Sequence, residues 1–158
     1  DVYLLGANYD AWVTNPPFFD AQIAPWLRRF ADAAHVVGKL LLTHTDGEND
    51  GLLASYLACE IDVADSVCPA PMTRLTMGDH RSAFGDRVAI MGGVPSVSLL
   101  DESMTDAQFE AFLDEFFAQL GDGRKLILGI SDTTPPAARF DRLQRIAEHI
   151  EQFGPVGW

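Results

Sequence analysis

The chain has 158 residues, 47% of them hydrophobic and 22% charged, which is the size and composition of a single globular domain. Its net charge of −12 argues against a nucleic-acid-binding surface, which normally needs clustered lysine and arginine. Two cysteines are too few for a disulfide framework, and the sequence has neither a signal peptide nor an apolar run of roughly 18 residues. We therefore expect a cytoplasmic protein that binds neither nucleic acid nor a membrane.

The predicted elements alternate between strands and helices along the whole chain. Strands are expected over residues 2–5, 39–45, 61–67, 88–91 and 125–129. Helices are expected over residues 18–35, 50–59, 105–120 and 140–153, with a short helix within 73–84. Thr105 and Gln108 form the capping-box pattern of a helix N-terminus. Strict alternation without hairpin signals predicts a parallel sheet, either doubly wound or closed into a barrel.

The connections between the elements favour the barrel. Those that follow the strands are long and polar, whereas those before them, such as residues 86–87 and 123–124, are short. This asymmetry is typical of a barrel whose site is built at one face, and a complete (β/α)8 barrel takes eight units and roughly 250 residues. We therefore expect an α/β fold in which residues 1–158 form a single domain. This domain would be the C-terminal five or so units of a TIM-type barrel with parallel strands, and further units would precede Asp1.

One strand end carries two groups with catalytic potential. Alternation along the strand over residues 39–45 predicts that His44 and Asp46, two positions apart, lie on the same side of the chain. They stand where a buried strand enters an acidic loop, and in parallel α/β folds chemistry is done at this end of the strands. His44 and Asp46 are accordingly candidate catalytic residues. The alternative is structural: a histidine at a strand end, followed by an aspartate that caps the next helix.

Other groups are expected at the same edge of the sheet. Asp65 and Ser66 lie near the end of the next strand, where either could orient a ligand or a metal-bound histidine. Cys68 follows them and is a candidate third metal ligand beside His44 and Asp46, although a cysteine before proline is also a common packing residue. Gly92 would allow a ligand to approach a strand end closely, or would simply relieve strain at a kink.

An ordered series of motifs resembles the uroporphyrinogen decarboxylase superfamily, which includes cobalamin- and coenzyme M-linked methyltransferases on the same barrel. The series comprises residues 38–47 (with His44 and Asp46), 61–66, 84–93 and 126–136. The resemblance covers essentially the whole chain. It implies a full barrel in which these residues form the C-terminal part.

The resemblance to the methyltransferase branch implies a zinc ion that activates a thiol, held by a His-x-Cys pair and a further Cys after the last strand. His44 matches the first ligand, Asp46 stands in place of the first Cys, and Ser131 and Asp132 stand near the place of the second. Carboxylates also bind zinc. The resemblance further implies an acidic, substrate-facing loop near Asn8 and Asp10. The methyl partner would be a corrinoid, a corrinoid protein or a thiol.

Two alternatives remain open. A uroporphyrinogen-type decarboxylase, a lyase, would need no cofactor and would bind an acidic tetrapyrrole, although the family's Gly-His-Gly is replaced by residues 129–131. An inactive five-strand piece would form a homo-oligomer to cover its sheet edges. We expect the five units on their own to be inactive and the metal-assisted methyltransferase to be the function of the whole protein. The substrate-binding residues would be Asn8, Asp10, Asp65, Ser66, Gly92, Ser131 and Asp132.

Overall fold

The structure is a computed structural model and describes residues 1–155. Five strands form one sheet: β1 (Val2–Leu4), β2 (Leu40–His44), β3 (Val63–Val67), β4 (Ala89–Val94) and β5 (Leu126–Ile130). The order of the strands in the sheet is β1-β2-β3-β4-β5, and every neighbouring pair is parallel. The prediction of parallel strands in sequential order is thereby confirmed.

Helical segments connect the strands. Before β2 come α1 (Pro16–Phe18), the π-helical segment η1 (Phe19–Ile23) and α2 (Ala24–Val36). The later segments are α3 (Leu53–Ala58), α4 (Met77–Phe84), the 3-10 helix η2 (Ser96–Leu99), α5 (Asp106–Ala118) and α6 (Phe140–Phe153). The predicted capping box at the start of α5 is present, because the Thr105 hydroxyl accepts from the Gln108 N–H while the Gln108 side chain accepts from the Thr105 N–H.

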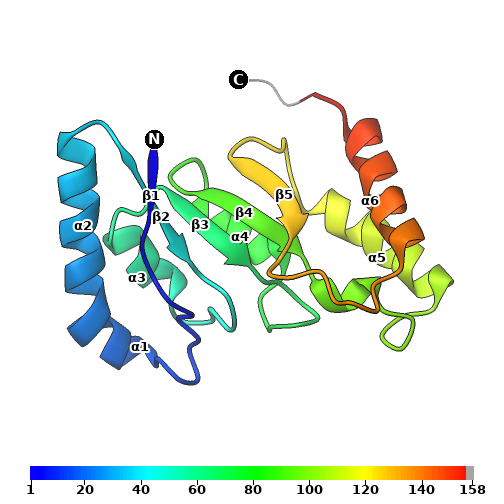
Figure 1. Cartoon of the computed structure of the whole chain (residues 1–158), viewed down its shortest axis with the longest axis horizontal. Coiled ribbons are helices and arrows are strands. Elements are labelled where there is room, and N and C mark those ends of the chain that lie inside the picture. The colour runs from blue at the N-terminus through cyan, green and yellow to red at the C-terminus, as the bar shows by residue number, and fades with distance from the viewer. Residues whose placement is uncertain (156–158) are drawn as a thin grey trace.

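The helices cover one face of the sheet. Right-handed crossovers between strands that follow one another in a single direction place every helix on the same side. The hydrophobic core accordingly lies between this helix layer and alternate strand residues, among them Leu41 and Ile90. On the opposite face, the neighbours of these residues are open: Leu40 is 45% exposed where Leu41 is 1% exposed. A sheet covered on one face by its helices is a sector of a (β/α) barrel, as predicted (Figure 1).

Three local features differ from the prediction. β4 continues through Gly92 and Gly93, where the glycine pair was expected to end the strand. The first helical segment begins at Pro16, since proline is well suited to the first helical position and the Asn15 side chain caps the helix by accepting from the Phe18 N–H. His80 stands between Asp79 and Arg81, a pattern that predicts a surface position, but it lies on the core-facing side of α4 and is buried.

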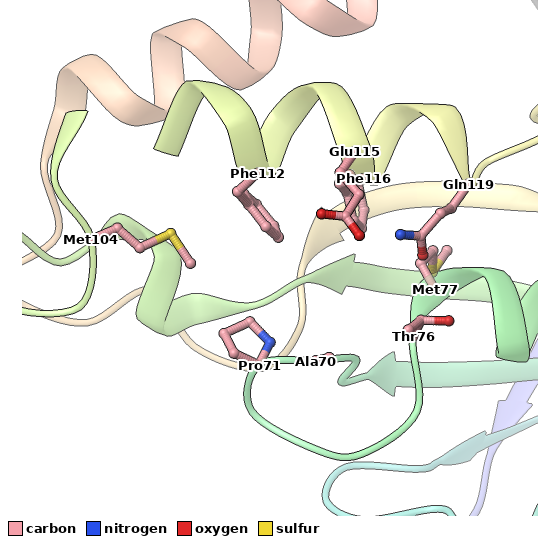
Figure 2. Close-up of a pocket in the computed structure, with 9 residues that line it drawn as sticks. All are labelled: Ala70, Pro71, Thr76, Met77, Met104, Phe112, Glu115, Phe116 and Gln119. Carbon is pink, nitrogen blue, oxygen red and sulfur yellow. The ribbon is translucent and has the colours of Figure 1, made fainter. Parts of the chain in front are cut away.

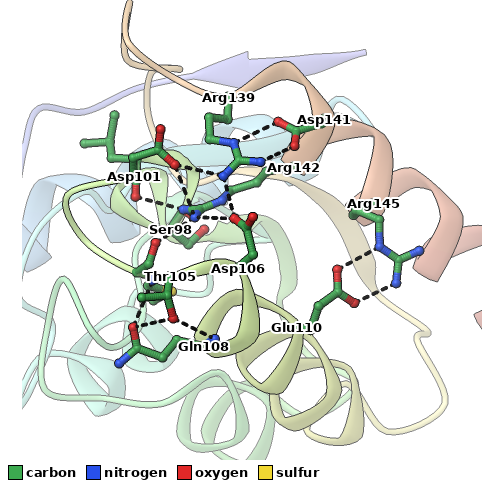
Figure 3. A network of polar contacts seen from close by, with 12 residues as sticks. Ser98, Asp101, Thr105, Asp106, Gln108, Glu110, Arg139, Asp141, Arg142 and Arg145 are labelled. Atoms are coloured by element: carbon green, nitrogen blue, oxygen red, sulfur yellow. Dashed lines mark hydrogen bonds and ion pairs between the residues drawn. The ribbon is translucent and has the colours of Figure 1, made fainter.

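A cluster of arginines and aspartates ties the loops that follow β4 and β5 to α6 (Figure 3). We call this cluster the arginine clasp; it comprises Asp101, Asp106, Arg139, Asp141 and Arg142. The buried Arg142 guanidinium donates to the backbone carbonyls of Ser98 (2.9 Å), Leu100 (2.8 Å) and Met104 (2.6 Å). It also donates to the Asp106 carboxylate at 3.2 Å. The clasp therefore fixes two of the loops on the side of the sheet where the site is predicted.

Residues 1–155 contain no helix with the length and hydropathy that a membrane crossing requires.

Candidate functional site

The centre of the predicted site is a hydrogen-bonded pair of side chains from two neighbouring strands. β2 and β3 are paired so that His44 lies directly beside Asp65, and the His44 Nδ1 and an Asp65 oxygen are 2.9 Å apart. Because an ionised carboxylate can only accept, this contact places the proton of a neutral His44 ring on Nδ1. Nε2 is then left with a lone pair, and it forms no hydrogen bond within residues 1–155. Sequence analysis placed both residues at this edge but did not foresee the pair.

Asp46 lies beside this pair, at the start of the loop after β2. Its carboxylate accepts a hydrogen bond from the Asn8 side-chain amide at 3.1 Å. Partial burial and, next in importance, the negative charge of Asp132 raise the pKa of Asp46, while nearby His44 lowers it. Two carboxylates from the ends of β2 and β5 therefore lie close enough to repel each other, as expected for strand ends that meet at one rim.

A hollow of about 200 Å³ opens on the uncovered face next to the pair. Five predicted site residues contribute to its lining: Asp65, Ser66, Gly92, Ser131 and Asp132. The remaining lining is apolar or backbone and comprises Met91, Ile127, Leu128, Gly129 and Ile130. The hollow thus joins an apolar floor to carboxylates at one end, and the structure brings together most of the residues that the sequence singled out.

Backbone geometry shapes this hollow. The pairing of β3 with β4 is irregular between Ala64 and Val67, and within this bulge Ser66 adopts a left-handed conformation (φ 58°). Gly92 faces the bulge with φ 109°, and a Cβ built on it would lie 3.1 Å from the Val67 nitrogen. The structure thus shows close backbone packing at Gly92, a role that differs from the two considered from the sequence. The Ser131 hydroxyl also has a partner within the chain: it donates a hydrogen bond to the Val94 carbonyl at 2.9 Å.

Both carboxylate oxygens of Asp10 accept hydrogen bonds from backbone N–H groups of the rim loops. One carboxylate oxygen accepts from the Trp12 N–H at 2.8 Å, and the other accepts from the Glu48 N–H at 2.9 Å. Glu48, which sequence analysis did not single out, is buried and accepts from the backbone N–H groups of Asp50 and Arg74. The acidic loop at residues 46–50 was the signal that could have identified it. These two carboxylates hold three loops together at the rim.

Cys68 lies close to the rim and contacts a methionine of its own loop. Its side chain is buried, and its Sγ lies 3.5 Å from the Met72 Sδ. Burial, and next the charge of Asp46, raise the pKa of the Cys68 thiol to about 11, so the thiolate form that binds metal is disfavoured. Residues 1–155 contain no group of three or more histidine, cysteine, aspartate or glutamate side chains placed to hold a metal ion. The predicted set of His44, Asp46 and Cys68 is therefore not assembled in this structure.

A second hollow, of about 230 Å³, lies on the helix-covered side between α5 and the loop after β3 (Figure 2). Phe112, Glu115 and Phe116 of α5 face Ala70 and Pro71 across it. None of the predicted site residues lines this hollow. It is separate from the His44 rim and brings together no pair of nucleophile and base.

Comparison with known proteins identifies a shared fold. No family model matches the sequence, and no curated protein matches it. A methyltransferase from Methanosarcina mazei matches the structure with a TM-score of 0.69 and 16% sequence identity. The match covers 98% of this chain and 43% of the methyltransferase, so the chain spans less than half the length of the protein it matches. At this identity the match shows the fold alone: five parallel strands alternating with helices, which correspond to part of the larger α/β fold of that methyltransferase.

Proposed function

We propose that the rim formed by His44, Asp65, Asp46 and Asp132 is one side of a methyl-transfer site, in a barrel of the uroporphyrinogen decarboxylase superfamily. The observation that carries this proposal is the His44–Asp65 pair, which leaves the His44 Nε2 free to take a proton. Two further findings support it. The fold matches that of a methyltransferase, and the sequence motifs follow the methyltransferase branch at His44.

His44 would act as the general base for the methyl acceptor. A thiol gives its proton to Nε2, its sulfur forms a bond to the methyl carbon, and the bond between that carbon and its carrier breaks with the electron pair leaving on the carrier. Asp65 holds the ring in the tautomer that this step needs and stabilises the imidazolium that forms. A corrinoid, as the carrier implied by the resemblance, would supply a reactive methyl group.

Zinc does not enter this mechanism. The resemblance implies a three-ligand site, with Ser131 and Asp132 near the place of the third ligand. Residues 1–155, however, contain no group of three or more histidine, cysteine, aspartate or glutamate side chains placed to hold a metal ion. A base is sufficient for the proton step because a thiol has a pKa of about 8.5, near enough to that of imidazole for transfer. No step is therefore assigned to a metal.

The charge of the rim argues against the decarboxylase alternative. An acidic tetrapyrrole would need basic side chains, yet the hollow beside His44 is lined by two aspartates and by neither lysine nor arginine. The charges of Asp46 and Asp132 already repel each other, as the raised pKa of Asp46 shows. A neutral or cationic methyl substrate meets no such repulsion.

The test is methyl transfer from methylcobalamin to a neutral thiol, 2-mercaptoethanol, measured in protein that contains this chain within a complete barrel. His44→Ala should lower the rate by about 10²–10⁴-fold, the range for loss of a general base. Asp65→Asn should lower it less and shift the pH profile, because the tautomer is no longer fixed. Cys68→Ser is the matched control and should retain activity.

Full activity of His44→Ala would contradict the proposal. Zinc content is measured in the same samples: a parallel loss of zinc and activity in His44→Ala would assign His44 to a metal site instead. In the 158-residue chain itself, ¹⁵N NMR of the His44 ring should show the proton on Nδ1, and Asp65→Asn should change that signal without any assay of activity.

A further inference from the structure

The helix layer is incomplete between α4 and α5. α4 has 8 residues and α5 has 13, so α4 is too short to run beside the whole of α5. Hydrogen bonds join α4 to the C-terminal end of α5: the Gly78 N–H donates to the Gln119 side-chain oxygen at 3.0 Å, and the Arg81 guanidinium donates to the Leu120 carbonyl at 3.1 Å. The rest of α5 faces the loop after β3 instead of a helix, and the hollow of Figure 2 lies between them.

Hydrogen bonds hold the loop after β3 in place as one wall of this hollow. The Ala70 N–H donates to the Leu75 carbonyl at 2.8 Å, which closes the loop on itself. The Arg74 N–H donates to the Glu48 carboxylate at 2.9 Å, which ties the loop to the rim. All lining residues lie within residues 70–119, between units that the structure describes on both sides. The same hollow would therefore be present in the complete barrel that the proposed function assumes.

Most of the lining is apolar. Phe112 and Phe116 of α5 stack on each other with ring centroids 5.6 Å apart; Phe116 is buried, whereas Phe112 is partly exposed. The remaining apolar lining comprises Ala70, Pro71, Met77 and Met104. A cavity of about 150 Å³ lined by apolar side chains can hold a benzene ring. The volume of about 230 Å³ found here therefore suits an aromatic ring or a branched aliphatic group that carries a short substituent.

One carboxylate supplies the charge of the hollow. Figure 2 shows the Glu115 carboxylate beside Gln119, on the side of α5 that faces the loop after β3. Glu115 is exposed and forms neither a hydrogen bond nor an ion pair within residues 1–155. The other polar groups have partners, since the Thr76 hydroxyl donates to Asp79 at 2.6 Å and the Gln119 oxygen accepts from Gly78. Among the described residues, the lining includes neither lysine nor arginine.

We propose that this hollow binds a small organic cation, an ammonium group attached to an aromatic or branched aliphatic body. The body lies against Phe112 and Met104, and the ammonium group donates hydrogen bonds to the Glu115 carboxylate. Hydrogen bonds between ionised groups are about twice as strong as neutral ones, and aromatic rings also attract cations. A ligand with a carboxylate or phosphate group is repelled by Glu115. The site shares no lining residue with the hollow at the His44 rim, so it is separate from the proposed methyl-transfer site.

Methionine NMR shows where the cation binds. Met77 and Met104 line this hollow, whereas Met91 lines the hollow at the acidic rim. Protein that contains this chain within a complete barrel is labelled with [methyl-¹³C]methionine, and its signals are assigned with single Met→Leu variants. Added 2-phenylethylammonium should shift the signals of Met77 and Met104. A shift of Met91 without shifts of these two would place the cation at the rim and overturn the proposal.

Three probes of similar shape test the charge preference. At the Met104 signal, 2-phenylethylammonium should bind about tenfold or more tightly than neutral 2-phenylethanol, the range for a hydrogen bond to a charged group, and 3-phenylpropionate should bind more weakly than either. Glu115→Gln should remove the preference for the ammonium and leave the affinity for the alcohol unchanged. Asp114→Asn is the matched control on the same helix, because the Asp114 side chain is 84% exposed and faces His149 of α6. This control should keep the preference.

Phe112→Ala should weaken the binding of the ammonium and of the alcohol alike, with its circular dichroism spectrum measured alongside. Equal affinities of the ammonium and the alcohol would assign a neutral apolar ligand to the hollow and overturn the proposal. Tighter binding of 3-phenylpropionate, or an unchanged preference for the ammonium in Glu115→Gln, would overturn it as well. So would the absence of any shift of Met77 and Met104 at the solubility limit of the ammonium probe.

Discussion

The His44 rim and the arginine clasp are both polar regions at the same side of the sheet, but they use their polar groups in opposite ways. In the clasp, Arg142 is 2% exposed and its guanidinium donates to three carbonyls and one carboxylate. Hydrogen bonds from Arg142 first, and from Arg139 next, lower the pKa of Asp106. At the rim, by contrast, burial and a neighbouring negative charge raise the pKa of Asp46, and the His44 Nε2 has no partner within residues 1–155.

This difference separates a structural region from a candidate functional one. The clasp pairs its acids with arginines, and hydrogen bonds from those arginines lower the pKa values of Asp106 and Asp141. These two acids therefore favour the folded state at neutral pH, and this contribution is lost as the pH falls through their lowered pKa values. The rim places a base and two repelling carboxylates beside an open hollow, which is unfavourable for stability but suitable for binding and proton transfer. Variants in the clasp should therefore change the free energy of unfolding, and variants at the rim should mainly change catalytic activity.

Arg142→Met should produce the largest loss of stability. The methionine fills much of the space but leaves the Ser98, Leu100 and Met104 carbonyls without their donor and Asp106 without a buried partner. Leaving a buried carbonyl without its hydrogen-bond donor costs about 1–3 kcal/mol, and three carbonyls lose a donor here. Urea unfolding followed by circular dichroism measures the change. Arg87→Met, at an exposed arginine before β4, is the matched control and should change the free energy of unfolding by less than about 0.5 kcal/mol. A loss below about 1 kcal/mol in Arg142→Met would remove the distinction between the two regions.

Gly92→Ala should have a smaller effect, and it tests whether the rim also depends on backbone geometry. At φ 109° an alanine is strained, and its Cβ would approach the Val67 nitrogen to 3.1 Å and the Ser131 carbonyl oxygen to 3.3 Å. Strain of this kind costs about 1–3 kcal/mol. Gly129→Ala is the control, since its backbone is unstrained and a Cβ there meets no atom within 4 Å. Equal stability of the two variants, measured by thermal unfolding, would show that Gly92 does not maintain the bulge.

The fold could be predicted because its signals are local and repeated. Apolar runs marked all five strands, and their alternation with helices was enough to predict a parallel sheet in sequential order. The capping box at Thr105 and the helix over 140–153 were predicted correctly because capping and helical periodicity depend on neighbouring residues. The set of residues at the rim was also predictable, since carboxyl ends of parallel strands meet at one edge. The continuation of β4 through Gly92 and Gly93 was missed because glycine usually signals a break.

The features that could not be predicted depend on contacts between distant parts of the chain. The acceptors of Arg142 lie 38 to 44 residues earlier and are backbone carbonyls, which leave no mark in the sequence. His80 stands between charged residues, a pattern typical of the surface, yet the packing of α4 buries it. The contact between Cys68 and Met72, four residues later in the same loop, was likewise not visible in the sequence. Composition and periodicity therefore predicted which residues reach the rim, but not which of them face one another.

Asp46→Asn should have the smallest effect, and it tests the sign of the electrostatics at the rim. Because the pKa of Asp46 is raised in the folded chain, the folded state binds more protons than the unfolded state at pH values above the ordinary carboxyl pKa of about 3.9. The free energy of unfolding should therefore fall as the pH rises through this window. Asparagine removes the titration and keeps an oxygen that can accept from Asn8.

The measurement is urea unfolding of the wild-type chain and of Asp46→Asn between about pH 3.5 and pH 7. The difference in free energy of unfolding, variant minus wild type, should increase with pH and then level off above the raised pKa. The increase should stay below about 1 kcal/mol, because Asp46 is only partly buried and water screens its interaction with Asp132. Glu102→Gln, at an exposed glutamate in the turn before α5, should give a flat difference. If this difference in free energy of unfolding instead decreases as the pH rises, the surroundings of Asp46 stabilise its charged form. The rim would then resemble the clasp, where the neighbours of Asp106 lower its pKa.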